Sequence, residues 1–295
     1  MKRILVFGGF GFLGYYLLKE LLSRGYNVVV ADIKDIYEFK DLVEYIKCDI
    51  SDQKQVEAVF ENQNYDVVYN LAGFANLDFA IKSPLKTMQL NVIGNMYVLE
   101  ACIAAKVKKF VYASSAYAMS NKGSFYGISK LASEKIVEEY HDKYDLDFTI
   151  LRYGSVYSEK EFDNNYIYNL VRKAVLDSII DHKGDGDEIR EYIHAGDASK
   201  LSVDVIESDK FNNVHVILTG TERMKRSELF NMINEILNNK IQINYNFNQQ
   251  DNHYKFTPYS FEPSISRKLT ANPHIDMGQG LLECVRSVYK NERNI

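Results

Sequence analysis

Three glycines stand at a fixed spacing near the start of the chain and could hold a phosphate group. Gly8, Gly11 and Gly14 follow the apolar run 4–7 and precede a segment with helical periodicity. A strand-to-helix turn needs glycine where the backbone bends and approaches a pyrophosphate, because a side chain would block the approach. The N–H groups and the positive dipole end of the helix then attract the anion. The spacing predicts a dinucleotide-binding loop, and the alternative is a glycine-rich turn without a ligand.

A carboxylate ends the second predicted strand. Asp32 lies 18 residues after Gly14, where an acidic side chain can accept hydrogen bonds from the ribose hydroxyls of an adenosine. Its negative charge also repels a 2′-phosphate, so the position favours NAD over NADP. Lys34 does not reverse this preference, because NADP sites generally use an arginine fork without a competing carboxylate. The alternative for Asp32 is a residue that caps a turn or a helix.

A tyrosine and a lysine four residues apart could move a proton. Tyr126 and Lys130 would lie on one face of a helix, shortly after Ser115 in the chain. Lowering the pKa of a phenol by ~3 units takes about 4 kcal/mol, which an ammonium and an oxidised nicotinamide ring can supply. The same spacing occurs at Tyr15 and Lys19, and there we interpret it as ordinary helix surface.

Alternating β-rich and helical segments must position these side chains. Their order is typical of βαβ units and a parallel sheet. We expect an α/β fold with a Rossmann-type doubly wound parallel sheet over 1–157 and a smaller C-terminal substrate-binding lobe over 158–295. Within that lobe about 190–212 is expected to return to the core, with 190–205 rejoining the sheet. The predicted strands are 4–7, 28–31, 45–48, 66–71, 110–113, 148–153 and 214–218, and the predicted helices are 13–24, 51–63 (capped by Ser51), 91–105, 126–144, 166–177, 226–237 and about 280–289.

Composition excludes several classes of protein. The 295 residues are 46% hydrophobic and 25% charged, which is typical of a globular enzyme. A net charge of −5 without a basic tract argues against nucleic-acid binding through phosphates. The N-terminal apolar run contains glycines and no small-x-small cleavage site, which argues against a secretory signal peptide. No stretch approaches the ~18 apolar residues of a membrane span. Cys48, Cys102 and Cys284 form no C-x-x-C pair, so we expect reduced thiols, a cytoplasmic location and no metal site.

Taken together, these residues resemble a known family, the extended short-chain dehydrogenases/reductases, and within it the NAD-dependent nucleotide-sugar epimerases and dehydratases. The resemblance covers nearly the whole chain and rests on several motifs in the family's order. The motifs are the glycine loop 8–14, Asp32, Cys48–Ile50, Asn70–Gly73, Asn91–Gly94, Lys109–Ser115, Tyr126 with Lys130, Leu151–Tyr157, Gly184–His194 and Gly278–Gly280.

The resemblance implies a role for individual residues. Tyr126 would be the general base for a sugar hydroxyl, Lys130 would hold the nicotinamide ribose and lower the pKa of Tyr126, and Ser115 would hydrogen-bond the same sugar oxygen. NAD would contact Gly8, Gly11, Phe12, Leu13, Gly14, Asp32, Asp49, Ile50, Leu71, Ala72, Gly73, Asn91, Tyr126, Lys130 and Tyr153. A nucleotide-diphosphate sugar would contact Ser115, Ser155, Asn165 and Arg190. The structural alternatives are a strand cap at Ser115, a helix cap at Asn165 and a solvated surface charge at Arg190.

Departures from the family pattern narrow the reaction. The segment Ser115–Tyr117 lacks the Asp-Glu pair with which 4,6-dehydratases eliminate water, so a dehydratase is disfavoured. Only ten residues separate Ser115 from Tyr126, about half of the usual stretch, which predicts a more open sugar pocket or a bulkier sugar. Three functions remain open. The favoured one is a nucleotide-sugar 4-epimerase, because an internal redox cycle suits NAD; the others are a 4-dehydrogenase or reductase and a non-catalytic nucleotide-binding protein.

The resemblance also implies a homodimer. Its interface would be a four-helix bundle made of helices 91–105 and 126–144 of each subunit, and no nucleic acid or membrane partner is expected. The apolar spacing in the first of these helices is compatible with that interface and equally with packing on the sheet; the residues concerned are Val92, Met96, Leu99 and Ile103.

Overall fold

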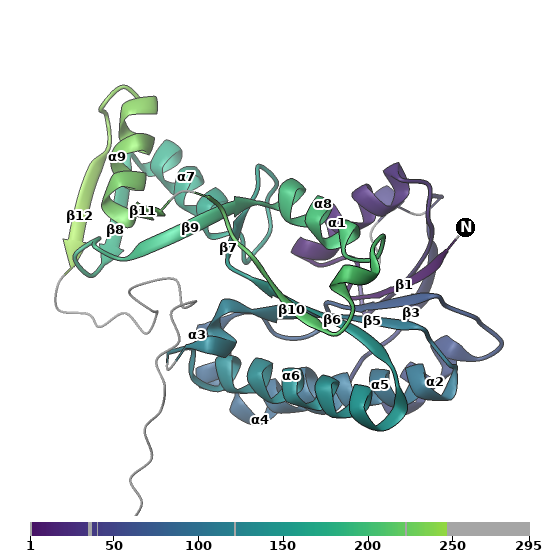
Figure 1. Cartoon of the computed structure of the whole chain (residues 1–295). Coiled ribbons are helices and arrows are strands. Elements are labelled where there is room, and N and C mark those ends of the chain that lie inside the picture. The colour runs from purple at the N-terminus through teal and green to yellow at the C-terminus, as the bar shows by residue number, and fades with distance from the viewer. Residues whose placement is uncertain (1, 35–36, 40, 121, 222, 247–295) are drawn as a thin grey trace, which may run out of the picture. The chain divides into compact units, whose positions relative to one another are not determined.

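A seven-stranded parallel sheet forms the core of this computed structural model, which describes residues 2–34, 37–39, 41–120, 122–221 and 223–246 (Figure 1). The strand order is β10-β6-β5-β4-β1-β2-β3. The strands are β1 (Arg3–Phe7), β2 (Asn27–Asp32), β3 (Glu44–Lys47), β4 (Val67–Asn70), β5 (Lys109–Ser115), β6 (Asp147–Tyr153) and β10 (Val214–Leu218). The chain order runs in opposite directions on the two sides of β1, so the switch point of this doubly wound sheet lies between β1 and β4. The predicted fold class is confirmed.

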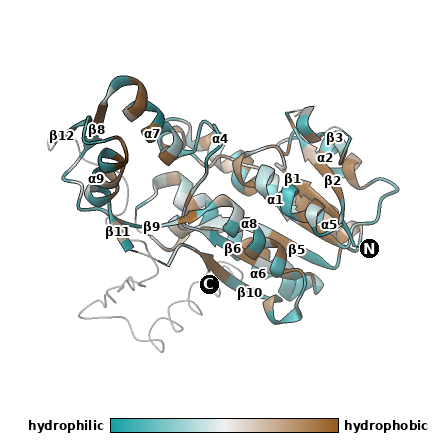
Figure 2. Cartoon of the chain, turned by 90° about the horizontal axis from the view of Figure 1, so that it is seen from above, coloured by the Kyte–Doolittle hydropathy of each residue, from teal (hydrophilic) through white to brown (hydrophobic). Residues whose placement is uncertain are grey.

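Helices cover both faces of the sheet, which is why its strands are apolar on both sides. Along β1, Ile4 and Val6 face one hydrophobic cluster and Leu5 and Phe7 face the other. The first face is covered by α1 (Phe12–Ser23) and α8 (Ala195–Asp204), and the second by α2 (Gln53–Phe60), α5 (Gly94–Ala104) and α6 (Ser124–Tyr144). In Figure 2 the strands β1 and β2 are coloured mainly as hydrophobic.

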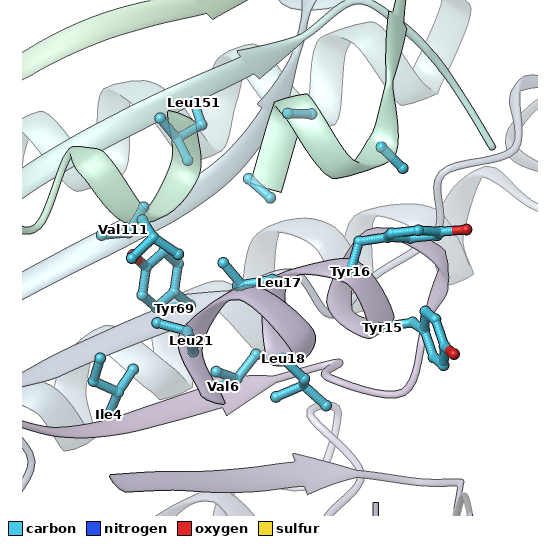
Figure 3. Packing of buried hydrophobic residues seen from close by; sticks show 14 of the residues in the cluster. Ile4, Val6, Tyr15, Tyr16, Leu17, Leu18, Leu21, Tyr69, Val111 and Leu151 are labelled. Atoms are coloured by element: carbon cyan, nitrogen blue, oxygen red, sulfur yellow. The ribbon is translucent and has the colours of Figure 1, made fainter. Parts of the chain in front are cut away.

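The first of the two clusters joins α1 to the middle of the sheet (Figure 3). Leu17 and Leu21 of α1 pack beside Tyr69 of β4, and Val6 lies in the same group. The Tyr69 hydroxyl donates to the main-chain carbonyl of Ser202, at 2.8 Å. This buried hydrogen bond satisfies the one polar atom that the aromatic ring brings into the core.

The ends of two predicted helices can be compared with the residues predicted to start or stop them. α1 is stopped by Gly25, as predicted, since this glycine has φ +77° and donates its N–H to Leu22. The cap expected at Ser51 is wrong. Asp52 caps α2 by accepting the N–H groups of Lys54 and Gln55, whereas the hydroxyl of Ser51 donates to Asp49. A carboxylate accepts two N–H groups at a helix N-terminus more strongly than a hydroxyl does.

The predicted helix 91–105 is part of a longer continuous segment. It runs through α4 (Pro84–Met88), one π-helical segment, η2 (Gln89–Ile93), and α5. Leu99 is fully buried in the cluster against the sheet, so of the two alternatives for this residue the structure selects packing on the sheet. The remaining short helices are η1 (Tyr37–Phe39), α3 (Leu77–Lys82), η3 (Ala116–Met119) and η4 (Asp209–Phe211).

Beyond β6 the chain builds two smaller sheets. β7 (Ser155–Tyr157), β9 (Ile189–His194) and β11 (Arg223–Lys225) form one, and β8 (Ile179–Lys183) pairs with β12 (Gln242–Asn246) in the other. α7 (Tyr166–Asp177) and α9 (Arg226–Ile236) pack with β8 and β12 around a third hydrophobic cluster.

The expectation that 190–205 rejoins the main sheet is wrong. β9 pairs with β7 and β11 instead, and the chain then enters α8, which packs on α1. The sequence of this segment indicates an extended backbone, but its pairing depends on β7 and β11, which lie far from it in the chain. The helix expected near 280–289, Gly278–Gly280 and Cys284 lie outside the described residues. Within the described part of the chain, no helix is long and apolar enough to cross a membrane.

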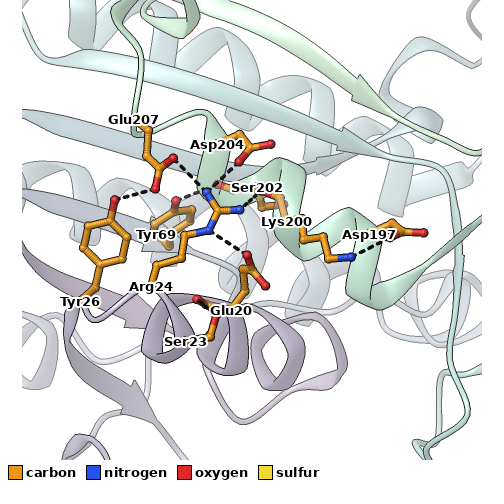
Figure 4. Close-up of polar contacts among 10 residues, drawn as sticks. All are labelled: Glu20, Ser23, Arg24, Tyr26, Tyr69, Asp197, Lys200, Ser202, Asp204 and Glu207. Atoms are coloured by element: carbon orange, nitrogen blue, oxygen red, sulfur yellow. Dashed lines mark hydrogen bonds and ion pairs between the residues drawn. The ribbon is translucent and has the colours of Figure 1, made fainter.

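One arginine ties α8 to α1 (Figure 4). Arg24 donates to Glu20 on its own helix at 2.7 Å, to Asp204 at 2.7 Å and to the carbonyl of Lys200 at 3.2 Å, and its guanidinium lies 3.0 Å from Glu207. The Arg24 side chain is 23% exposed, so its charge is partly shielded from water. Among the described residues, three carboxylates therefore share this one cation.

We expect Arg24→Met to lower the free energy of unfolding by about 1–3 kcal/mol, because the three carboxylates lose their hydrogen-bond donor and then repel one another. Urea denaturation followed by circular dichroism measures this. The matched control is Lys200→Met. Its ammonium makes a solvent-exposed pair with Asp197 at 3.4 Å, and its loss should change stability by less than about 0.5 kcal/mol. Equal effects of the two substitutions would contradict the role given to Arg24.

Candidate active site

The glycine loop between β1 and α1 has no room for a Cβ at Gly8 or Gly14. Gly8 has φ +73°, and a Cβ there would lie 2.7 Å from the main-chain nitrogen of Ala72. A Cβ at Gly14 would lie 2.4 Å from the Gly8 carbonyl oxygen. α1 begins after Gly11, where no side chain caps the helix. The loop therefore brings bare backbone to a helix N-terminus, which is the arrangement that binds phosphate.

Asp32 is fixed at the end of β2 by the same loop. One carboxylate oxygen accepts the N–H of Phe10 and the other accepts the N–H of Lys34, both at 2.9 Å. The residue is 7% exposed and lines the cleft beside the loop. Each carboxylate oxygen has two lone pairs, so both oxygens can still accept a bond from a ribose hydroxyl.

An open cleft lies at the carboxyl ends of β1, β2 and β4, at the switch point of the sheet. Its empty volume is about 750 Å³, part of which is open to solvent. Eight of the residues predicted to contact the cofactor line it: Gly8, Gly11, Asp32, Asp49, Ile50, Leu71, Ala72 and Gly73. Lys34, Cys48 and Phe74 also line it, and the sequence reading had not assigned them to the cofactor.

Other predicted cofactor residues lie outside that cleft lining. Phe12, Leu13 and Gly14 form the first turn of α1, and the ring of Phe12 packs against Phe162, with the centroids 5.2 Å apart. Tyr153 is buried, and its hydroxyl hydrogen-bonds that of Ser202 at 2.7 Å. The Phe12 and Tyr153 side chains therefore serve the hydrophobic core, because each is packed against another element.

Asn91 links the cleft to the helix that carries Tyr126. Its side chain accepts the N–H of Phe74 at 2.7 Å and donates to the Phe74 carbonyl at 3.0 Å and to the Ser129 hydroxyl at 2.9 Å. Ser129 in turn donates to the carbonyl of Tyr126 at 2.8 Å. A Cβ at Gly73 would lie 2.5 Å from the Asn91 side-chain oxygen. Asn91 is thus a buried brace between two parts of the site.

Ser115, Tyr126 and Lys130 are all buried at the end of β5 and the start of α6. Ser115 is 7% exposed, Tyr126 is 7% exposed and Lys130 is 5% exposed. The Lys130 ammonium donates to the carbonyl of Ala113 at 2.8 Å, two residues before Ser115. This bond fixes α6 against β5 and brings the three predicted catalytic residues into one region.

Tyr117 connects Ser115 with Tyr126. Its N–H donates to the Ser115 hydroxyl at 3.3 Å, and its ring meets that of Tyr126 edge to face, with centroids 5.9 Å apart. A Cβ at Gly123 would lie 2.7 Å from the Tyr117 ring. The short connection between β5 and α6 therefore folds around this ring, a contact that the sequence reading missed.

The environment of Lys130 makes it a weaker base than an exposed lysine. Burial lowers its pKa to about 8, and the carboxylate of Glu134 acts in the opposite direction. The ammonium also lies 4.9 Å from the centroid of the Tyr112 ring, whose face attracts a cation. Lys130 can consequently carry its positive charge near neutral pH and lose it above about pH 8.

Of the four residues predicted to bind substrate, three lie beyond β5. Asn165 caps α7 through its side-chain oxygen, and its amide nitrogen donates to Ser158 and to the carbonyl of Lys160. The helix cap, which was the structural alternative for Asn165, therefore describes this side chain. Ser155 lies on β7, and Arg190 lies on β9 of the same three-stranded sheet. Arg190 is only 2% exposed, so it is not a solvated surface charge.

A sequence profile of the NAD-dependent epimerase/dehydratase family matches residues 4–218. The chain belongs to this family. Its cofactor is NAD, and the residues present fit that group, because the glycines leave the loop backbone bare and Asp32 is held beside it. No cluster of metal-ligating side chains occurs among the residues that the structure describes.

Proteins similar to this chain are named as nucleotide-sugar epimerases and dehydratases. A putative UDP-glucose 4-epimerase of Methanocaldococcus jannaschii is 24% identical, with 98% of this chain and 99% of that protein covered. The human dTDP-D-glucose 4,6-dehydratase is 25% identical, with 75% of this chain and 70% of that protein covered. The crystal structure of the Thermotoga maritima UDP-glucose 4-epimerase with UDP-glucose has a TM-score of 0.80 and 23% identity, covering 88% of this chain and 90% of that one. This last likeness establishes a shared fold.

We expect Gly8→Ala to weaken NAD binding at least tenfold, or about 1.4 kcal/mol, because the new Cβ would push the loop away from Ala72. Isothermal titration calorimetry with NAD measures the change. Gly25→Ala is the matched control, since Gly25 also has a positive φ, +77°, but a Cβ there has nothing within 4 Å. That variant should carry backbone strain of about 1–2 kcal/mol and bind NAD normally. Unchanged affinity in Gly8→Ala would show that the loop does not hold the cofactor.

Proposed function

We propose that the protein is a nucleotide-sugar 4-epimerase in which Ser115, Tyr126 and Lys130 are the catalytic residues. The observation that carries this proposal is the bond from the buried Lys130 ammonium to the Ala113 carbonyl. It holds a cation one helical turn from the Tyr126 phenol and beside the strand that ends in Ser115. An ionisable phenol next to a fixed cation is what proton abstraction from a sugar hydroxyl needs at neutral pH.

Each side chain has a defined task in this proposal. Tyr126, as phenolate, accepts the proton of the sugar C4 hydroxyl and later returns it. Ser115 hydrogen-bonds the same oxygen, and Lys130 keeps the pKa of the phenol low through its charge. NAD, when bound, supplies reversible hydride exchange at C4, and inversion follows when the sugar presents its other face.

Elimination of water, the reaction of a dehydratase, lacks its acidic residues here. Ala116 and Tyr117 follow Ser115, so no carboxylic acid stands at either position to protonate a leaving hydroxyl. The Ala116 side chain is a buried methyl group, 1% exposed, and offers no proton. This supports epimerase over dehydratase, although relatives of both kinds exist.

The substrate in this proposal carries a nucleoside diphosphate. Arg190 is the residue that would bind it, because a guanidinium fork matches two phosphate oxygens. Its burial on β9 supports the assignment, since a phosphate-binding arginine shielded from water interacts more strongly. Ser155 on the neighbouring strand β7 would contact the sugar.

We also propose a cytoplasmic location. Cys48 and Cys102 are free and buried, and burial raises the pKa of both thiols, to about 12 for Cys48. Reduced thiols of this kind are typical of proteins from a reducing compartment.

A homodimer is supported by apolar side chains on the outer surface of α6 and the segments beside it. Ile128 is 56% exposed and Leu85 is 86% exposed. Phe125, Leu131 and Ile93 are exposed on the same group of elements, which pack against one another. We propose that a second copy of the chain covers this surface through α6 and the segment from α4 to α5, because burial of such side chains stabilises association.

The decisive experiment offers the purified protein UDP-, GDP-, dTDP- and CDP-sugars with NAD. An epimerase gives a product of unchanged mass and inverted C4, which mass spectrometry and nuclear magnetic resonance detect. A product lighter by two hydrogens would instead identify a nucleotide-sugar 4-dehydrogenase, and loss of water would identify a dehydratase.

The control for this assay is Tyr126→Phe, which removes the base and keeps the ring. We expect its turnover to fall by about 10²–10⁴-fold while its affinity for NAD changes little. Near-normal turnover in this variant would remove Tyr126 as the base.

The dimer is tested by Ile128→Glu, which should convert the protein to a monomer in analytical ultracentrifugation, because a charge cannot be buried unpaired in the interface. Ile236→Glu is the control. Ile236 is 72% exposed on α9, away from the proposed interface, so this variant should sediment as the wild type does. A monomeric wild type, or an unaltered Ile128→Glu dimer, would contradict the proposal.

A further inference from the structure

A fully buried carboxylate lies one helical turn beyond Lys130. Glu134 is 0% exposed, and its position on α6 places it on the same helical face as Tyr126 and Lys130. Burial of a carboxylate is costly unless charged and hydrogen-bonding partners surround it. The partners of Glu134 therefore indicate what the residue does.

Glu134 joins α6 to the two strands that carry the site. One carboxylate oxygen accepts the Ser114 hydroxyl at 2.5 Å and the Nε of Arg152 at 3.0 Å, and the other accepts Nη2 of Arg152 at 2.7 Å. Ser114 immediately precedes Ser115 on β5, and Arg152 lies on β6. The pair with Arg152 has the two-pronged geometry that fixes both side chains most firmly.

The ion pair between Glu134 and Arg152 also contacts the segment that follows Ser115. Nη1 of Arg152 donates to the sulfur of Met119 at 3.1 Å, and Met119 ends η3, which follows Ser115. Glu134 and Arg152 thus hold the residue before Ser115 directly and a residue after it through η3. A displacement of either member would release the end of β5.

We propose that Glu134 is a positioning residue of the reaction, which fixes Ser115 through Ser114 and Arg152 and places a negative charge one helical turn from Lys130. The inference rests on the proposed function of Ser115, Tyr126 and Lys130, and it adds a residue to which neither the sequence motifs nor the cleft had assigned a role.

The charges around Lys130 agree with this assignment. Burial lowers the pKa of Lys130, and the negative charge of Glu134 raises it. From β5, Lys130 faces the Tyr112 ring and the Ala113 carbonyl, and Tyr126 is the titratable group before it on α6. Without the Glu134 carboxylate, the ammonium would lose its proton at a lower pH.

Charged groups on other elements meet Glu134 rather than Lys130. Arg152 of β6 pairs with Glu134, and the Nδ1 of His215, on β10, lies 3.6 Å from the Glu134 carboxylate. Glu138 follows on α6 and bonds His215 at 2.8 Å and Lys135 at 2.6 Å. Glu138 carries the same charge as Glu134, but among the residues that the structure describes the Ser114 hydroxyl bonds Glu134 and not Glu138, which makes Glu138 the matched control.

The experiment compares Glu134→Gln with Glu138→Gln across pH 6–10. For Glu134→Gln we expect kcat at pH 8 to fall at least tenfold, with the KM for the sugar within about twofold, and the alkaline decline of kcat to move toward neutral pH. Glu138→Gln should keep the wild-type kcat and pH profile. Ser114→Ala removes the hydrogen bond without changing charge, so its kcat should fall while the alkaline decline stays in place.

Glu134→Gln leaves Arg152 without its buried partner and could unfold the protein. The double variant Glu134→Gln/Arg152→Gln removes both charges, and its alkaline decline should also move toward neutral pH. An alkaline decline identical to the wild type in whichever of these variants folds, or equal effects of Glu134→Gln and Glu138→Gln, would overturn the proposal.

A second measurement separates this inference from the proposed function. The affinity for NAD, measured by calorimetry across the same pH range, should decline where Lys130 loses its charge, and it should do so at lower pH in the variants that lack Glu134. This readout needs no sugar. If Tyr126→Phe keeps its turnover, the proposed function fails; if NAD affinity in the Glu134 variants follows the wild-type pH dependence, only the role of Glu134 fails.

Discussion

The buried ammonium of Lys130 is the constraint on which the rest of the site depends. A lysine taken out of water keeps its charge only where nearby groups stabilise it, and here the Ala113 carbonyl, the Tyr112 ring and the Glu134 carboxylate do so. The first two belong to β5, so the lysine can be satisfied only if α6 lies against that strand. The contact that stabilises the charge therefore also determines where Tyr126 stands relative to the end of the sheet.

The parallel sheet supplies the other half of this arrangement. All of its strands end at one edge, and the cleft at the switch point lies beside Gly8 and Asp32 at that edge. The backbone at Gly8 lies so close to Ala72 that a Cβ has no room there, where the chain turns from β1 toward α1. A dinucleotide bound along this edge would extend from the end of β2 toward β4 and β5, where Ser115 is found.

Local patterns were enough to predict the fold class and the cofactor, and eight of the residues assigned to NAD line one cleft. The glycine loop, Asp32 and the pair Tyr126–Lys130 all depend on spacing within one or two neighbouring elements, and short-range physics determines them. The helix cap at Asn165 was among the local alternatives, since its partners lie five to seven residues before it in the chain. Tyr153 could not be placed in this way, because its hydroxyl bonds Ser202, on a distant segment. Glu134 did have a local signal, its position four residues after Lys130 on a helix, but its significance came from Arg152 on β6, whose contact with α6 requires the two elements to be packed together.

The brace formed by Asn91 and Ser129 runs from Phe74, at the cleft, to the carbonyl of Tyr126. Its members are joined by hydrogen bonds in a buried setting, where an unmade bond is expensive. Ordering one end of the brace therefore restricts the other, and thermodynamic coupling of this kind is reciprocal. In the proposed reaction, binding of the dinucleotide beside Phe74 and alignment of the Tyr126 phenol would therefore be linked through the side chains of Asn91 and Ser129.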